Sequence, residues 1–128
     1  MKIEHIAIWS MDIEKLKEFY VKYFGAECNS KYINEKRDFQ SYFLSFDTGA
    51  RIEIMQISGL EAMSESEKVF AGFSHFALSV GSKEAVDKIT QKISEDGLKV
   101  ISEPRTTGDG YYESLVLDTD GNKVEITI

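Results

Sequence analysis

Two histidines and two glutamates stand at equivalent places in the two halves of the chain. His5 opens the segment H-I-A-I and His75 opens H-F-A-L, and the chain contains no other histidine. Glu53 lies within R-I-E-I and Glu125 within K-V-E-I. Imidazole and carboxylate groups bind divalent transition metals such as Zn²⁺, Ni²⁺, Co²⁺, Fe²⁺ and Mn²⁺. We therefore predict that these four residues surround one metal ion.

The ligand types favour a catalytic centre over a structural one. The chain has one cysteine, Cys28, so neither an intrachain disulfide nor a thiolate zinc cluster can form. A metal held by nitrogen and oxygen alone can expand to five or six positions and keep water. Open positions of this kind are typical of catalytic metal sites.

Strand alternation places the four groups on one side of their strands. Side chains at i and i+2 share a face, and in each segment apolar residues alternate with the histidine or glutamate. The apolar neighbours can pack beneath a helix, which leaves the metal-binding group on the opposite face. Trp9 and Met55 share that face in the first half, so we predict that they line a substrate pocket.

The same order of elements is predicted twice. Asp12 and Ser82 are expected to cap two helices, and Gly25 and Gly97 to end them. Alternation and turn residues indicate the strands. The expected helices cover 13–24 and 83–96, and the expected strands cover 3–9, 26–32, 39–46, 51–57, 74–80, 98–103, 112–118 and 123–128.

These elements predict an α+β fold of two tandem β-α-β-β-β modules, residues 1–57 and 73–128, joined by a polar linker over 58–72. A chain of 128 residues suits one domain with a sizeable core. We therefore expect a single domain, 1–128, in which the modules form a curved mixed sheet around a metal cleft.

Charge and hydropathy disfavour several classes of partner. The net charge of −7 argues against nucleic acid and anionic membrane surfaces, which both attract basic patches. No apolar run approaches the roughly 18 residues of a membrane span, and the N-terminus lacks a signal-peptide pattern. We expect a cytoplasmic protein whose partner is a small-molecule substrate.

The chain resembles the vicinal oxygen chelate superfamily, which includes glyoxalase I, antibiotic-resistance proteins and extradiol dioxygenases. The matching parts are the opening His5, the first helix, the segment G-F-S-H-F-A-L at 72–78 and the closing D-T-D-G-N-K-V-E at 118–125. The last is the most specific, and is similar to the family's D-P-D-G-N-x-x-E. The resemblance implies a glyoxalase-like fold, often a homodimer, with its metal ligands at the same four positions, His5, Glu53, His75 and Glu125.

The complete His-Glu-His-Glu set is similar to that of glyoxalase I. This implies a lyase or isomerase that uses Zn, Ni or Co, with Fe or Mn as alternatives. In such enzymes the metal holds two substrate oxygens and stabilises an enediolate, while a carboxylate moves the proton. The resemblance assigns that proton transfer to Glu125 or Glu53.

One departure bears on the substrate. Glyoxalase I enzymes usually carry an arginine four residues after the first histidine, where it binds glutathione, and Trp9 stands there in this chain. A glutathione adduct is therefore disfavoured. The glycine-rich segment 104–112 offers other substrate-binding candidates: Arg105 for an anionic group, and Tyr111 and Tyr112 for the pocket wall or a hydrogen bond.

Two other functions remain open at this point. A ferrous extradiol-type dioxygenase would use His5, His75 and Glu125 as a facial triad, with Glu53 left over. A non-enzymatic drug-binding resistance protein would use the cleft without the metal. The His5/Glu53 pair can meet the His75/Glu125 pair within one chain or across a dimer, and the sequence is compatible with both.

Overall fold

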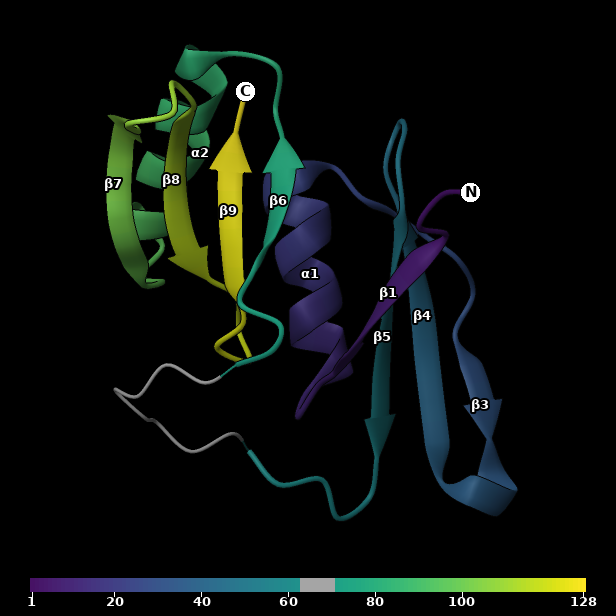
Figure 1. The fold of residues 1–128 in the computed structure, drawn as a ribbon. Coiled ribbons are helices and arrows are strands. Elements are labelled where there is room, and N and C mark those ends of the chain that lie inside the picture. Colours follow the sequence, from purple (N-terminus) through teal and green to yellow (C-terminus); the bar gives the residue numbers. More distant parts are fainter. Residues whose placement is uncertain (63–70) are drawn as a thin grey trace. The chain divides into compact units, whose positions relative to one another are not determined.

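The computed structural model describes residues 1–62 and 71–128. The chain divides into two compact units, Met1–Ala62 and Met63–Ile128. Each unit combines one α-helix with a mixed sheet (Figure 1), so the fold class is α+β, as the sequence predicts. That the two modules form a single domain around a cleft stays a prediction.

The first unit is a five-stranded sheet with helix α1 against one face. Its strands follow the order β1-β5-β4-β2, and β3 also pairs with β4. Strand β1 runs parallel to β5, and the other pairs are antiparallel. The elements are β1 (His5–Trp9), α1 (Ile13–Phe24), β2 (Glu27–Cys28), β3 (Tyr32–Asn34), the 3-10 helix η1 (Glu35–Arg37), β4 (Phe39–Ser45) and β5 (Arg51–Ile57).

Helix α1 begins and ends where the sequence predicts. The Asp12 side chain accepts a hydrogen bond from the Lys15 N–H at 3.1 Å, which satisfies a donor of the first turn. Gly25 ends the helix with φ 64°, a left-handed conformation that favours glycine. The apolar side of the helix packs on β4 and β5 through Ile13, Leu16, Phe19, Tyr20 and Tyr23.

A charged cluster ties the polar edge of α1 to the sheet. Tyr42 Oη on β4 donates a hydrogen bond to Glu14 Oε1 at 3.0 Å. The same carboxylate pairs with Lys17 and, at 2.5 Å, with Lys31. These lysines, Lys17 foremost, lower the pKa of Glu14 to about 2. Glu14 therefore stays ionised throughout the physiological range.

The second unit repeats the plan with four strands. Its sheet has the order β6-β9-β8-β7, with β6 parallel to β9 and the other pairs antiparallel. Helix α2 lies against β7, β8 and β9. The elements are β6 (Phe76–Ser79), α2 (Lys83–Glu95), β7 (Val100–Thr106), β8 (Tyr112–Leu117) and β9 (Lys123–Thr127).

Helix α2 is held to its sheet by apolar packing and one buried polar contact. Ser82 caps the helix by accepting a hydrogen bond from the Ala85 N–H at 3.1 Å, as predicted. Thr90 Oγ1 donates to the Val86 carbonyl at 2.7 Å and lies 2.6 Å from Ser114 Oγ on β8. Both hydroxyls are buried, so each provides the other's partner away from water.

Two predicted strands differ from the observed ones. The segment 26–32 is interrupted, because the Asn29 side chain accepts the Phe43 N–H at 2.7 Å in place of a main-chain acceptor. Strand β7 continues past the predicted 98–103 to residue 106, with register shifts on both sides of Ser102. Pro104 lies within the second shift, where its missing N–H is tolerated. Residues 63–70 of the predicted linker lie outside the described residues.

The motif D-T-D-G-N has a structural explanation. Asp118 is buried, and its Oδ1 accepts hydrogen bonds from the N–H groups of Asp120 and Asn122 at 3.0 and 2.9 Å. The Asn122 side chain also donates to this carboxylate. The turn is fixed by these bonds and sets the β8–β9 register, which places Leu115 opposite Glu125.

Among the described helices, none is long and apolar enough to cross a membrane.

Candidate metal centre

His5 and Glu53 lie together on the face of the first sheet that α1 leaves uncovered. They come from the parallel neighbours β1 and β5, and alternation puts the intervening Ile52 and Ile54 in the core. His5 Nε2 is 3.8 Å from Glu53 Oε2. The two side chains are partly exposed, at 39% and 18%, so they remain accessible to a ligand. The first predicted pair is therefore assembled within one unit.

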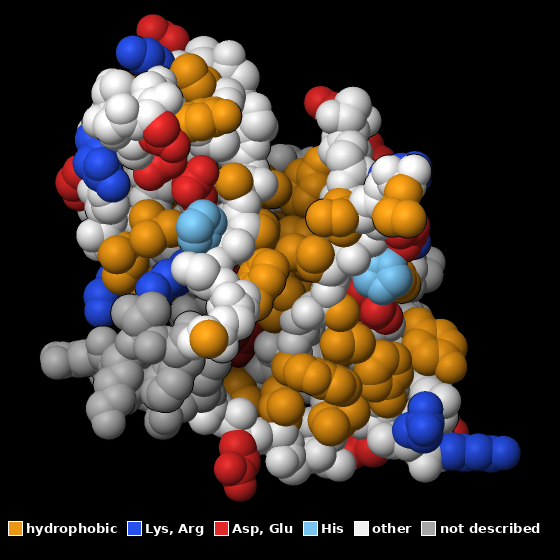
Figure 2. Space-filling model, in the orientation of Figure 1, with side chains coloured by type: hydrophobic (Ala, Val, Ile, Leu, Met, Phe, Trp, Pro, Cys, Tyr) orange, Lys and Arg blue, Asp and Glu red, His pale blue; other side chains and the backbone are white. Residues whose placement is uncertain are grey.

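Aromatic and apolar side chains surround this first pair. Phe43 lies opposite Glu53 in the β4–β5 register, and its ring meets the His5 ring edge-on at 5.4 Å. Trp9 lies opposite Met55 on the same face, is 47% exposed and packs edge-on against Phe39 at 6.3 Å. Figure 2 shows apolar side chains gathered over the strands of this unit. Alternation alone predicted Trp9 and Met55 on this face, and the structure adds Phe39 and Phe43 from β4.

A charged pair contacts the other nitrogen of His5. Its Nδ1 lies 2.5 Å from Glu4 Oε2. The second oxygen of Glu4 accepts hydrogen bonds from Arg51 Nε, at 2.9 Å, and Arg51 Nη2. These contacts, with His5 the stronger, lower the pKa of Glu4. The sequence reasoning overlooked Glu4, although its place directly before a candidate metal ligand was a usable signal.

His75 and Glu125 form the corresponding pair in the second unit. His75 Nε2 is 3.1 Å from Glu125 Oε2, and the two belong to the β6–β9 edge of the second sheet. His75 Nδ1 lies 3.3 Å from the Ser74 hydroxyl. Burial raises the pKa of Glu125, and the nearby Glu113 carboxylate raises it further, while His75 opposes both effects. A bound cation would offset the cost of ionising this carboxylate.

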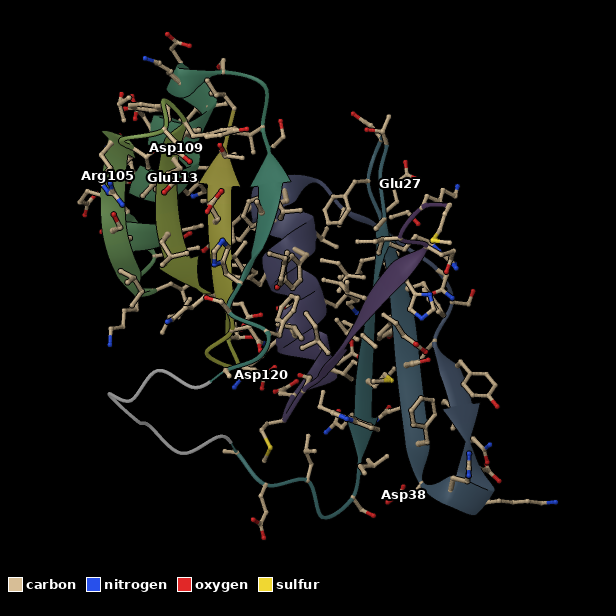
Figure 3. The ribbon with its side chains drawn as sticks, viewed as in Figure 1. Glu27, Asp38, Arg105, Asp109, Glu113 and Asp120 are labelled. Atoms are coloured by element: carbon tan, nitrogen blue, oxygen red, sulfur yellow. The ribbon has the colours of Figure 1, made fainter. Side chains whose placement is uncertain are left out.

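A second carboxylate, Glu113, accompanies Glu125. Arg105 lies opposite Glu113 in the β7–β8 register, with Nη2 3.9 Å from Glu113 Oε1. Arg105 Nε also donates to Ser102 Oγ at 3.2 Å. Figure 3 shows Arg105, Asp109 and Glu113 in the same part of this unit. The predicted anion-binding arginine is thus partly engaged by an acid, which the sequence reasoning did not identify.

The two tyrosines of this region differ in their surroundings. Tyr111 is 56% exposed in the turn before β8, where its N–H and C=O both bond to Thr107. Tyr112 donates a hydrogen bond from Oη to Asp87 Oδ1 of α2 at 2.6 Å, and Lys83 of α2 lies over its ring. Tyr112 therefore faces the helix rather than the side of Glu125, so we drop it from the proposed substrate-binding residues.

The donor chemistry fits a divalent metal, provided that both pairs contribute. Each unit offers one imidazole nitrogen and one carboxylate oxygen a few ångströms apart. Among residues 1–62 and 71–128, no group of three or more His, Cys, Asp or Glu is placed to hold a metal ion. Two ligands are too few for a transition-metal site. A complete centre would therefore need ligands beyond those of either pair alone.

Comparison with known proteins identifies the relatives of this chain. The family model for the Glyoxalase/Bleomycin resistance protein/Dioxygenase superfamily matches residues 2–126. The protein YwkD of Bacillus subtilis, described as uncharacterized, is 32% identical over 97 residues, which cover 76% of this chain and 73% of YwkD.

Solved structures share the fold. Glyoxalase I from Zea mays matches 98% of this chain with a TM-score of 0.81 and 22% identity, and this chain spans 44% of the maize chain, less than half. A possible glyoxalase from Bacillus cereus matches 100% of this chain and 99% of its own, with a TM-score of 0.73 and 26% identity. The fold of this chain is therefore glyoxalase-like.

Proposed function

Because this chain belongs to the glyoxalase/bleomycin resistance protein/dioxygenase superfamily, we propose that it is a metal-dependent lyase or isomerase of the glyoxalase I type. It acts on a small oxygenated metabolite through an enediolate, as a cytoplasmic homodimer. The observation that carries the proposal is the repeated His–Glu pair on each sheet, His5 with Glu53 and His75 with Glu125. Many superfamily members differ in activity, so the site, and not the fold, supports this choice.

The proposed centre takes its ligands from both pairs. When bound, a divalent metal would polarise two neighbouring oxygens of the substrate and so acidify the adjacent carbon. Zn, Ni or Co suits this chemistry, and Fe or Mn is compatible with the same ligands. Glu125 or Glu53 then accepts the proton from one carbon and returns it to the next. Glu125 is a suitable candidate, because burial and the neighbouring Glu113 carboxylate raise its pKa, so it takes up a proton more readily than a free carboxylate does.

The surroundings of the pairs suggest how the substrate is oriented. Trp9 and Met55 would cover an apolar part of the substrate beside the first pair. Arg105 would approach a polar or anionic part beside the second, and Tyr111 would line its edge. Arg51, which lies beside His5 in the β1–β5 register, is engaged by Glu4 and so is poorly placed to act like the arginine that binds glutathione in glyoxalase I. A glutathione-independent substrate fits this surface better.

Elemental analysis of protein purified without chelators tests the metal centre. We expect about one transition metal for each set of four ligands, and its loss in His5→Ala and in His75→Ala. Tyr112→Phe, which changes the helix-covered face, is the matched control and should keep the metal. If iron were the metal found and the protein consumed oxygen when a catechol was added, the dioxygenase function would be supported instead. No metal after reloading would favour the drug-binding protein.

Mixing two variants determines whether the pairs combine across a dimer. His5→Ala and His75→Ala subunits each lack one ligand of any centre made within a single chain, so their mixture would bind no more metal than either alone. Centres shared between subunits behave differently, because each mixed dimer regains one complete set of ligands. We expect partial recovery of metal binding after the two variants are unfolded together and refolded. Unchanged binding would place the centre within one chain.

A further inference from the structure

The Nδ1 atoms of the two candidate metal-binding histidines, His5 and His75, contact different partners. His5 Nδ1 contacts a carboxylate, Glu4 Oε2, at 2.5 Å. His75 Nδ1 contacts a hydroxyl, Ser74 Oγ, at the longer distance of 3.3 Å. A carboxylate accepts a hydrogen bond and cannot donate one, whereas a hydroxyl can do either. Only the first partner therefore dictates which nitrogen of its histidine carries the proton.

Glu4 is itself held in place by Arg51. Arg51 donates from Nε and Nη2 to Glu4 Oε1, and the Arg51 N–H donates to the Glu4 carbonyl at 3.0 Å. The guanidinium carbon lies 4.2 Å from the centre of the Phe43 ring, which also meets the His5 ring edge-on at 5.4 Å. Isolated exposed ion pairs contribute little, but a pair with two donors and stacking has a defined geometry. The Glu4 carboxylate is thus oriented toward His5.

We propose that Glu4 and Arg51 are positioning residues that keep the proton of His5 on Nδ1 and its lone pair on Nε2, toward Glu53. Nε2 is the nitrogen that faces the Glu53 carboxylate, at 3.8 Å. The importance of this tautomer for metal binding rests on the proposed function, in which Nε2 and Glu53 hold the same metal. Carboxylates in this relation to a histidine raise its basicity and fix the orientation of its ring. The ring orientation and tautomer of His5 are therefore fixed before a metal binds. His75, whose Nδ1 contacts the Ser74 hydroxyl, is held less firmly.

The tautomer of His5 can be measured in metal-free protein. Two-bond proton–nitrogen NMR spectra separate the Nδ1–H and Nε2–H forms, and with only two histidines His75→Gln assigns both. At a pH where both rings are neutral, we expect His5 in the Nδ1–H form in the unmodified protein and a shift toward Nε2–H in Glu4→Ala. Glu4→Asp should restore part of the original form. His75 provides an internal control, since its spectrum should not change.

Metal titration measures the consequence. We expect Glu4→Ala to weaken Co²⁺ binding by about 10–100-fold, the usual effect of losing a carboxylate behind a histidine ligand. Arg51→Gln should have a smaller effect in the same direction. Ser74→Ala, the matched change in the second unit, should alter the affinity far less.

The two readouts separate the inference from the function on which it rests. An unchanged His5 tautomer in Glu4→Ala would overturn the positioning role, whatever the metal affinity. Equal losses of affinity in Glu4→Ala and Ser74→Ala would overturn the difference between the two histidines. If the unmodified protein bound no Co²⁺, the proposed function would fail, and the tautomer spectra would still decide the role of Glu4.

Discussion

The exposed ring of Trp9 should make this protein prefer ligands that carry an aromatic group. Trp9 is 47% exposed and shares a sheet face with His5 and Glu53. A phenyl ring laid on the open half of the indole would remove roughly 50 Å² of apolar surface from water, which at about 25 cal/mol per Å² contributes about 1.2 kcal/mol. That free energy corresponds to about an eightfold change in Kd.

Two hydroxamates measure this contribution. Acetohydroxamate and benzohydroxamate present the same two oxygens to a metal and differ in a methyl or phenyl group. Calorimetric titration of metal-loaded protein gives both Kd values, and the fluorescence of the single tryptophan reports contact independently. We expect Trp9→Ala to reduce the preference for benzohydroxamate about eightfold while leaving acetohydroxamate binding nearly unchanged. Comparing the variant with the unmodified protein cancels the intrinsic difference between the two chelators.

Val21→Ala is the control for this measurement. Val21 is 43% exposed on helix α1, so the substitution removes a similarly accessible apolar side chain from a helix. It should leave both Kd values unchanged. A phenyl preference that survives in Trp9→Ala would refute the assignment of this ring to the binding site. Loss of binding for both hydroxamates would instead indicate that the substitution disturbs the metal pair itself.

Three further predictions concern stability and follow from buried or charged contacts. Glu14→Gln should lower the free energy of unfolding by about 1 kcal/mol at pH 7, after allowance for the exposure of the ion pairs. Because the pKa of Glu14 is lowered to about 2 in the folded protein, this difference should vanish in denaturant titrations as the pH falls from about 4.5 toward 2. Thr90→Val should cost about 1–3 kcal/mol by leaving the Ser114 hydroxyl unpaired, and Thr90→Val/Ser114→Ala should recover part of it in a double-mutant cycle. Asp118→Ala should lower Tm, with a cost of about 1–3 kcal/mol, since three donors lose a buried acceptor.

The first candidate pair, His5 and Glu53, could be placed on one face from the sequence because its elements are regular. Asp12 and Gly25 bound the helix without ambiguity, and the alternation of Ile52 and Ile54 leaves Glu53 facing away from it. Even Phe43 could have been placed, because a turn centred on Thr48 puts residue 43 opposite residue 53, as observed. Alternation tells which residues of one strand share a face, whereas the register across the turn tells which residues of the neighbouring strand lie beside them.

The second unit was harder to predict because its strands are less regular. The segment before Leu117 has apolar residues at both odd and even positions, so alternation does not reveal that Glu113 shares a face with Leu115. Strand β7 shifts register around Ser102, and a slip of one residue moves every later side chain to the opposite face. The direction of Arg105 therefore depends on irregularities that no local sequence pattern specifies. The same ambiguity leaves open from sequence which face of β8 carries Tyr112, and in the structure it contacts Asp87 of α2.

The differences between the two modules indicate what the proposed substrate must look like. A duplicated metal site requires the histidine and glutamate of each module and leaves their neighbours free to diverge. Trp9 and Met55 face each other across β1 and β5, whereas the equivalent neighbours across β6 and β9 are Ser79 and Thr127. The second module also adds Glu113, where the first has a serine. For the proposed centre, in which both pairs hold one substrate, we therefore expect a substrate with an apolar side and a hydrogen-bonding side.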